Sequence, residues 1–213
     1  MGIWKHFGKS GRRENKIKIY GKNNKICVFE DTEEVPLAIS KSAVWSGCRL
    51  VIIGNGNLFD VGVGLIKQTS FVIQKSDNSR IVIGSDIFIG SGTFLIEEPE
   101  TFITIGRDCM FSDNITVRCS DGHPIYDKQG NIINRAYGIA IGNHVWLGCH
   151  VTVLKNVELA DDIVVGAGSV VTKSFIRSGV IIAGVPAKTV KEDIQWSKDF
   201  LGRTSAEEQP SEK

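Results

Sequence analysis

The sequence predicts an all-β fold, a parallel β-helix assembled from six-residue repeats. Its composition favours strands, because 27 Ile and 20 Val stand against only 9 Leu and 9 Ala, and β-branched side chains suit strands better than helices. The 23 Gly among 213 residues predict many turns. Aliphatic residues also recur every six positions, a period too long for simple strand alternation and too short for a helical hairpin.

The repeat is most regular in residues 141–176. The first positions of successive hexads are aliphatic: Ile141, Leu147, Val153, Leu159, Val165 and Val171. A second series follows four residues after each of these: Val145, Val151, Val157, Ile163, Ser169 and Phe175. Each hexad predicts a short strand and a turn, with its first residue pointing inward. Stacked coils about 4.8 Å apart would pair the backbone groups and bury a continuous core. The alternative is a β-sandwich with accidental spacing.

The same step is found upstream, where these residues are also expected to point inward: Ile53, Phe59, Leu65, Phe71, Ile83, Ile89, Leu95, Ile105, Phe111 and Val117. Residues 16–50 carry a weaker repeat and predict imperfect first coils. Interruptions at 75–80 and 97–101 predict loops between coils. The longest break, 118–138, predicts a loop extruded from the solenoid, where functional residues are expected.

Three parts follow from this pattern. Residues 1–15 are expected to form a flexible basic leader, residues 16–188 the β-helix domain, and residues 189–213 a C-terminal helix with a polar tail. The helix is predicted over 190–201 from four apolar positions: Val190, Ile194, Trp196 and Phe200. A turn is expected just before it, at 184–188.

The charge balance argues against a nucleic-acid-binding protein, because 25 Lys and Arg against 24 Asp and Glu leave a net charge of only +1. Five Cys without a CxxC pair indicate a reducing compartment. No segment has the length and apolarity of a transmembrane helix, and the leader lacks an apolar signal-peptide centre. We therefore expect a cytoplasmic protein; contact of the leader with the inner membrane face is the alternative left open.

Four motifs occur in order: Asp121–Tyr126 in the long loop, Ile141–Gly148 where the repeat restarts, Val165–Lys173 where it closes, and Ala183–Lys188 after it. Together they resemble the left-handed β-helix, or hexapeptide-repeat, acyltransferases. The likeness is strongest to bacterial capsule polysialic acid and polysaccharide O-acetyltransferases. The resemblance implies a left-handed helix, a homotrimer, and acetyl-CoA lying in a groove between neighbouring β-helices. It also implies a carbohydrate acceptor in a surface polysaccharide, such as capsule or lipopolysaccharide, and no metal.

Transfer of an acetyl group to a hydroxyl needs a base for the hydroxyl proton and donors for the oxyanion. His123 in the D-x-H-P-I-Y segment is the predicted general base. Asp121 can orient its ring, or can simply form a turn before Gly122. Trp146 resembles the active-site Trp of the family, where it donates through the indole or excludes water; packing at a trimer interface is its alternative role.

The resemblance assigns the coenzyme to residues near the ends of hexads: Gly148, Cys149, Ala167, Thr172, Lys173 and Lys188. Cys149 and Ala167 would line the pantetheine arm, and Lys188 would reach a phosphate. The acceptor sugar is expected near the loop, beside Arg118, Tyr126 and Arg135, although both Arg side chains can also be solvated. Ser91–Thr93 stands where simpler sugar acetyltransferases carry an Asn, which argues against a small mono- or disaccharide acceptor.

Four other functions remain open at this point. A zinc hydratase of the γ-carbonic anhydrase type needs three His, yet His144 and His150 lie one hexad apart and so on different sides of a coil. Cys119 or Cys149 can carry an acetyl intermediate. A β-helix can also be a scaffold without catalysis. The last alternative is N-acetylation of an amino-sugar nucleotide.

Overall fold

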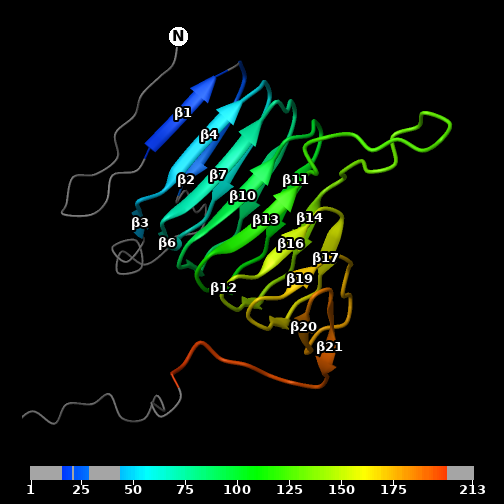
Figure 1. Ribbon diagram of the computed structural model, residues 1–213. Helices are drawn as coiled ribbons and strands as arrows, with labels where there is room; N and C mark the ends of the chain where they lie inside the picture. Colours follow the sequence, from blue (N-terminus) through cyan, green and yellow to red (C-terminus); the bar gives the residue numbers. More distant parts are fainter. Residues whose placement is uncertain (1–15, 21, 29–43, 201–213) are drawn as a thin grey trace, which may run out of the picture.

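The computed structural model describes residues 16–20, 22–28 and 44–200. It is a stack of three-sided coils, with one long loop leaving the side of the stack (Figure 1). The predicted leader, residues 1–15, and the whole of the predicted polar tail lie outside the described residues. Within those residues, no helix has the length and apolar character needed to cross a membrane.

Three sheets form the sides of the stack, and the chain visits them in turn. The first sheet is entirely parallel, in the order β1 (Lys16–Tyr20), β4 (Arg49–Ile53), β7 (Thr69–Gln74), β10 (Gly92–Ile96), β13 (Ile115–Cys119), β16 (Thr152–Leu154) and β19 (Val170–Val171). The second sheet is also parallel, in the order β17 (Val157–Leu159), β14 (Ile139–Ile141), β11 (Phe102–Ile105), β8 (Arg80–Ile83), β5 (Leu58–Val61) and β2 (Lys25–Val28).

The third sheet ends in the only antiparallel pairing between named strands of the described chain, β20 with β21. Its order is β21 (Ala187–Lys191), β20 (Ile181–Gly184), β18 (Val164–Val165), β15 (Trp146–Leu147), β12 (Met110–Phe111), β9 (Ile87–Ile89), β6 (Gly64–Lys67) and β3 (Val44–Ser46). We call the corners between sheets the first–second, second–third and third–first edges. The described strands at the start of the weak repeat do form the first coil, because β1, β2 and β3 pair with β4, β5 and β6.

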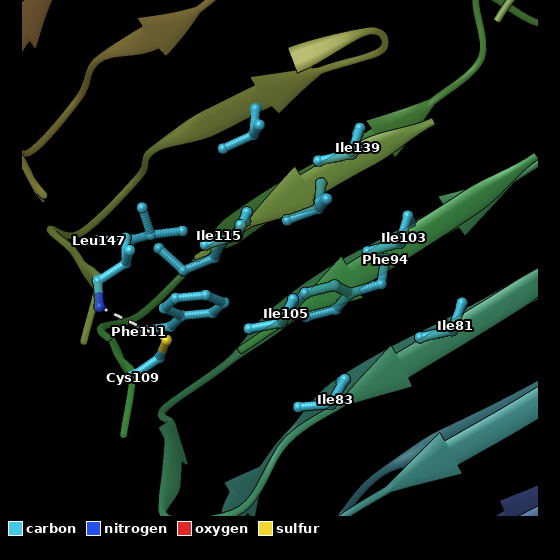
Figure 2. Close-up of a cluster of buried hydrophobic side chains, with 14 of the residues drawn as sticks. Ile81, Ile83, Phe94, Ile103, Ile105, Cys109, Phe111, Ile115, Ile139 and Leu147 are labelled. Atoms are coloured by element: carbon cyan, nitrogen blue, oxygen red, sulfur yellow. Dashed lines mark hydrogen bonds between the residues drawn. The ribbon is translucent and has the colours of Figure 1, made fainter. Parts of the chain in front are cut away.

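The core is a set of ladders that run up the inside of the stack. On the second sheet, Ile81, Ile103 and Ile139 are aligned in successive coils and are fully buried (Figure 2). The lower coils enclose a stack of aromatic rings 5.0–6.4 Å apart between centroids: Trp45, Phe59, Phe71, Phe94 and Phe111. Because burial of apolar surface contributes roughly 25 cal/mol per Å², we expect these ladders to supply most of the free energy that stabilises the stack.

The hexad register predicted for residues 141–176 is confirmed, since every residue of both series is buried. In this region the coil is three hexads long: Val153 pairs with Val171, which lies 18 residues later. Turn residues take positive φ at the edges, as with Asn156 and Asp162. The predicted interruptions at 75–80 and 97–101 lie between β7 and β8 and between β10 and β11, at the first–second edge.

The upstream register is wrong at three positions. Ile53 is exposed, and Leu65 and Leu95 are half-buried. Adjacent residues point inward instead: Ile52, Ile66 and Phe94. The physical reason is that the lower coils carry extra residues at their edges. Phe71 pairs with Phe94, which lies 23 residues later, so a strict count of six loses the register.

The predicted helix over 190–201 is also wrong within the described residues. Residues 187–191 form β21, which pairs with β20 across the turn expected at 184–188. The chain then runs extended along the second–third edge, where Trp196 stacks on His144 with ring centroids 4.1 Å apart. Contacts with the β-helix therefore override a weak amphipathic pattern, because an isolated short helix is unstable in water.

The corrected register predicts opposite effects for two neighbouring isoleucines. Ile52→Ala should lower the free energy of unfolding by about 2–5 kcal/mol, since it opens a cavity in the core. Ile53→Ala, the matched control on the outer face of β4, should cost less than about 1 kcal/mol. Denaturant melts of both variants would measure this. A larger loss of unfolding free energy in Ile53→Ala than in Ile52→Ala would support the register expected from sequence, with Ile53 pointing inward.

Candidate active site

The extruded loop begins after β13 and ends before β14, at the first–second edge (Figure 1). Its two arms approach each other at a bridge between Tyr126 and Ile132. The tip is closed by the Asp127 carboxylate, which accepts hydrogen bonds from the backbone of Gln129 and Asn131. The loop therefore has a defined shape despite its length.

Side chains of the coil below hold both ends of the loop. The Glu98 carboxylate accepts a hydrogen bond from the Ser120 hydroxyl at 3.3 Å and another from the Ala136 N–H at 3.1 Å. Beside it, Glu97 forms an ion pair with Arg118 at 3.0 Å. Two adjacent acidic residues thus tie the start and the end of the loop to one corner of the β-helix.

Side chains of the coil above hold the same loop from the other direction. The Asn156 amide accepts from the Tyr137 N–H at 2.7 Å and donates to the Arg135 carbonyl at 3.0 Å. Lys155, only 17% exposed, forms an ion pair with Asp121. The loop is consequently held between successive coils at the first–second edge.

A pocket opens between the loop and this edge, lined by Glu97, Glu98, Ser120, Gly122, His123, Pro124, Ile132, Asn134 and Arg135. His123 is exposed, and its ring makes no hydrogen bond within the described chain. The imidazole is therefore accessible to a substrate proton. An accessible imidazole nitrogen in this pocket can accept the proton of a bound hydroxyl, which fits general base chemistry.

Asp121 makes different contacts from those expected from sequence. Its carboxylate accepts hydrogen bonds from Lys155 and, at 2.8 Å, from the Asn134 amide. These two bonds, that of Lys155 first, hold the pKa of the Asp121 carboxyl below its ordinary value. Within the residues that the structure describes, no hydrogen bond joins this carboxylate to the His123 ring.

The three predicted sugar-binding residues differ in availability. The Arg118 guanidinium is engaged by Glu97 and by the Ser120 carbonyl at 2.8 Å, so its donors are largely committed. The Arg135 side chain is exposed, lines the pocket beside His123, and forms no ion pair in the described part of the chain. Tyr126 is 57% exposed on the loop. Of the two cations, Arg135 is the one free to meet an anionic group.

The predicted coenzyme residues fall on two different edges. Gly148 and Cys149 lie at the third–first edge, and the Gly168 N–H donates to the Cys149 carbonyl at 2.8 Å, so Ala167 stacks on them in the next coil. A Cβ at Gly148 would come within 2.7 Å of the Ala167 nitrogen, which explains the glycine. Lys188 continues this edge, since it pairs with Ala183 in the hairpin above.

Thr172 and Lys173 lie elsewhere, directly after β19, at the first–second edge and one coil above the pair that holds the loop. The structure therefore brings four coenzyme candidates together at the third–first edge: Gly148, Cys149, Ala167 and Lys188. Thr172 and Lys173 lie instead at the first–second edge, which also carries His123.

Trp146 opens β15 on the third sheet, in a row with Met110 and Val164. Its indole Nε1 is buried without a hydrogen-bond partner in the described residues. The Trp196 ring lies 5.7 Å away, centroid to centroid. A strand of the second sheet separates Trp146 from the His123 loop along the chain, and no described contact joins the two residues within one chain.

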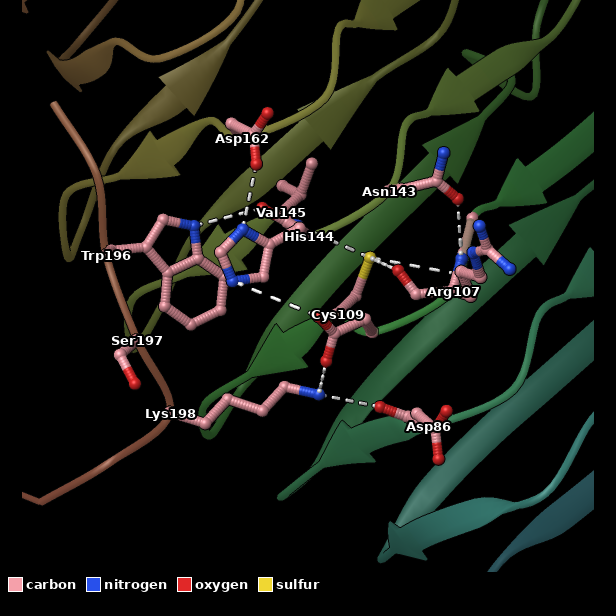
Figure 3. Close-up of polar contacts among 12 residues, drawn as sticks. Asp86, Arg107, Cys109, Asn143, His144, Val145, Asp162, Trp196, Ser197 and Lys198 are labelled. Carbon is pink, nitrogen blue, oxygen red and sulfur yellow. Dashed lines mark hydrogen bonds and ion pairs between the residues drawn. The ribbon is translucent and has the colours of Figure 1, made fainter. Parts of the chain in front are cut away.

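His144 is held by contacts with neighbouring side chains of the fold, which Figure 3 shows. Its Nδ1 lies 2.9 Å from the Asp162 carboxylate, and its ring stacks on Trp196, whose indole donates to the His144 carbonyl at 3.0 Å. His150 lies at the third–first edge, so the two His lie on different edges of the coil, as their spacing of one hexad predicted. The described residues contain no group of three His, Cys, Asp or Glu side chains placed to hold a metal.

Comparisons with known proteins place the chain in a family. It is 33% identical over 188 residues to the polysialic acid O-acetyltransferase of Neisseria meningitidis, a match that covers 78% of this chain and 87% of that enzyme. It is 35% identical over 127 residues to the polysialic acid O-acetyltransferase of Escherichia coli O1:K1, covering 59% of this chain but only 41% of that enzyme. No family model matches the chain.

The chain belongs to the hexapeptide-repeat O-acetyltransferases.

Solved structures agree with this membership. The crystal structure of the polysialic acid-specific acetyltransferase NeuO superposes with a TM-score of 0.64 at 25% identity, covering 92% of each chain. That of the polysialic acid O-acetyltransferase OatWY gives 0.61 at 28% identity, covering 87% of this chain and 94% of that one. The stack of coils is thus the parallel β-helix predicted from the repeats, with the left hand that the family resemblance implied.

Sequence reasoning missed four residues that shape this O-acetyltransferase loop: Glu98, Asn134, Lys155 and Asn156. Glu98 and Asn134 lie in predicted interruptions of the repeat, 97–101 and 118–138, whereas Lys155 and Asn156 lie at a corner within the regular hexads. Their partners were not visible, because each contact joins residues 19 to 38 positions apart, except those made by Asn134 within the loop.

The cysteines differ in their capacity to act as nucleophiles. Burial raises the pKa of the Cys119 thiol to about 11, against a smaller lowering effect of the Thr101 hydroxyl. Burial does the same for Cys48 and Cys109. Cys149 is exposed. Because the thiolate is the reactive form, the structure disfavours Cys119 as an acetyl carrier at neutral pH.

Alkylation at neutral pH should therefore select among these four thiols. Iodoacetamide should modify Cys149 and leave Cys48, Cys109 and Cys119 intact in the folded protein, as read by peptide mass mapping. Cys149→Ser is the matched control. Acetyl-CoA should slow the reaction if the coenzyme covers the third–first edge. Alkylation of Cys119 at the rate of Cys149 would contradict the burial described above.

Proposed function

We propose that the enzyme transfers the acetyl group of acetyl-CoA to a hydroxyl of a sugar in a bacterial surface polysaccharide, such as capsule or lipopolysaccharide. One observation carries the proposal: the His123 ring is accessible in a pocket whose loop is held by the coils below and above. A fixed loop with an available base is what acyl transfer to a hydroxyl requires.

In the proposed reaction, a His123 ring nitrogen removes the proton of the sugar hydroxyl while the oxygen attacks the thioester carbonyl carbon. A C–O bond forms as the C–S bond breaks, and the imidazolium returns the proton to the departing CoA sulfur. A backbone N–H near Gly148 or Cys149 is the proposed oxyanion donor. Attack is direct, in a ternary complex, which agrees with the raised pKa of the Cys119 thiol.

The active protein is proposed to be a homotrimer with its sites between copies. His123, Thr172 and Lys173 lie at the first–second edge, whereas Cys149 and Lys188 lie at the third–first edge. A rotation that packs β-helices side by side would bring one edge of each copy toward another edge of its neighbour.

Trp146 is proposed to serve the neighbouring copy's site. Its indole N–H is buried without a partner in the described chain, and such a donor costs about 1–3 kcal/mol unless an acceptor meets it. An acceptor from a bound substrate or a second copy would remove this cost. Asp121 is proposed to support His123 from within the same loop.

The acceptor is proposed to be an acidic polysaccharide. Two matched relatives are named polysialic acid O-acetyltransferases, and a third, 33% identical over 153 residues, is a putative lipopolysaccharide biosynthesis O-acetyl transferase of Escherichia coli K12. The uncommitted Arg135 guanidinium beside His123 can pair with a sugar carboxylate. Tyr126 and Arg118 would complete the acceptor surface. We place the reaction in the cytoplasm and the catalytic domain in residues 16–188.

A release assay tests this function. Purified enzyme and acetyl-CoA are offered acidic and neutral oligosaccharides, and free CoA thiol is measured. We expect turnover with sialic-acid polymers above that with neutral glycans, and a product whose acetyl group is lost in mild base. A base-stable product on an amino-sugar nucleotide would favour N-acetylation instead. The absence of both turnover and CoA binding would favour a scaffold.

Replacing the base should stop the chemistry and spare the coenzyme. His123→Ala should lower kcat by about 100-fold or more, because the hydroxyl proton loses its acceptor. The affinity for CoA, measured by calorimetry, should stay near that of the wild type, since His123 is not among the residues assigned to the coenzyme. Turnover at the wild-type rate in this variant would remove His123 from the mechanism.

A further inference from the structure

The His123 loop contains a side chain that joins its two arms. The Asn134 amide oxygen accepts a hydrogen bond from the Ile125 N–H at 2.7 Å. Its amide nitrogen donates to the His123 carbonyl at 2.9 Å and to the Asp121 carboxylate at 2.8 Å. One half-buried side chain on the returning arm thus makes three bonds to the arm that carries the base.

These bonds restrain the backbone on both sides of the base. The segment reads His123–Pro124–Ile125, and proline has a fixed φ and no N–H to hold it in place. The bonds to the His123 carbonyl and to the Ile125 N–H enclose this proline. The orientation of the amide is fixed by chemistry, because the Ile125 N–H needs an acceptor while the carbonyl and the carboxylate need donors.

The third bond connects this arrangement to the β-helix. Asp121 is ion-paired with Lys155, which lies at a corner of the next coil and is only 17% exposed. A chain of contacts therefore runs from the rigid stack through Lys155, Asp121 and Asn134 to the backbone of His123. Hydrogen bonds to a charged carboxylate are stronger than neutral ones, so this chain resists rearrangement.

We propose that Asn134 is the positioning residue for His123, and that Asp121 acts on the base through Asn134 and not by contact with the imidazole. This inference rests on the proposed function. The loop would then hold the imidazole in its reactive position, because a displacement of the base by about 1 Å can lower the rate by up to about 100-fold.

The test uses Asn134→Ala beside a matched control in the same loop. Asn131 is also an asparagine whose amide bonds an aspartate, Asp127, but it lies at the loop tip and does not line the pocket. Asn134→Ala should lower kcat by about 10- to 100-fold without changing the KM for acetyl-CoA or the melting temperature. Asn131→Ala should keep the wild-type kcat. If Asn134→Ala does not fold, Asn134→Asp, which keeps the acceptor for Ile125 and loses both donors, takes its place.

A double-mutant cycle separates positioning from direct action. If Asp121 acts through Asn134, Asp121→Ala together with Asn134→Ala should lower kcat no further than the more severe single variant. Either of two results would overturn the positioning role alone. The two effects could multiply in the double variant, or Asn134→Ala could keep the wild-type kcat while His123→Ala is inactive. Wild-type kcat in His123→Ala would overturn the proposed base as well, so the two failures are distinguishable.

Discussion

Parallel stacking of three-sided coils is the constraint on which the rest of this structure depends. Each inward ladder, such as Ile81, Ile103 and Ile139, fixes the register of one coil on the next. The corners must then lie above one another, so residues distant in sequence share an edge. This is how Glu98 and Asn156 come to hold the same loop, and how Cys149 and Ala167 come to line one edge.

The same constraint divides the candidate site. Catalysis needs a base and the thioester within a few ångströms of one another. A single three-sided coil cannot place its own corners together, because the core fills the space between them. The accessible His123 ring lies at one edge, and the unpartnered Trp146 indole lies on another side of the coil. In the proposed reaction these two groups therefore come from different copies of the chain. The proposed homotrimer would bring the two groups together without any movement of the stack.

Sequence alone predicted the β-helix because its signal is local: in residues 141–176 a coil is three hexads long, and the aliphatic period survives. It failed at Leu95, since the inserted corner residues of the lower coils shift the count. It failed over 190–201 because the stacking of Trp196 on His144 joins distant segments and leaves no periodic trace. The loop was predictable from the break in the repeat, and the motif within it singled out His123 as a candidate. The partners of Asp121 were not, because Lys155 lies 34 residues away.

The most direct test of a site divided between copies is complementation. His123→Ala and Trp146→Ala chains, each carrying a different affinity tag, are co-expressed, and mixed trimers are isolated through both tags. A site that takes its base from one copy and its Trp from another leaves one intact site in every mixed trimer, so about a third of the wild-type rate should return. Mixed trimers as inactive as either parent would contradict the account and place both residues in a single chain's site.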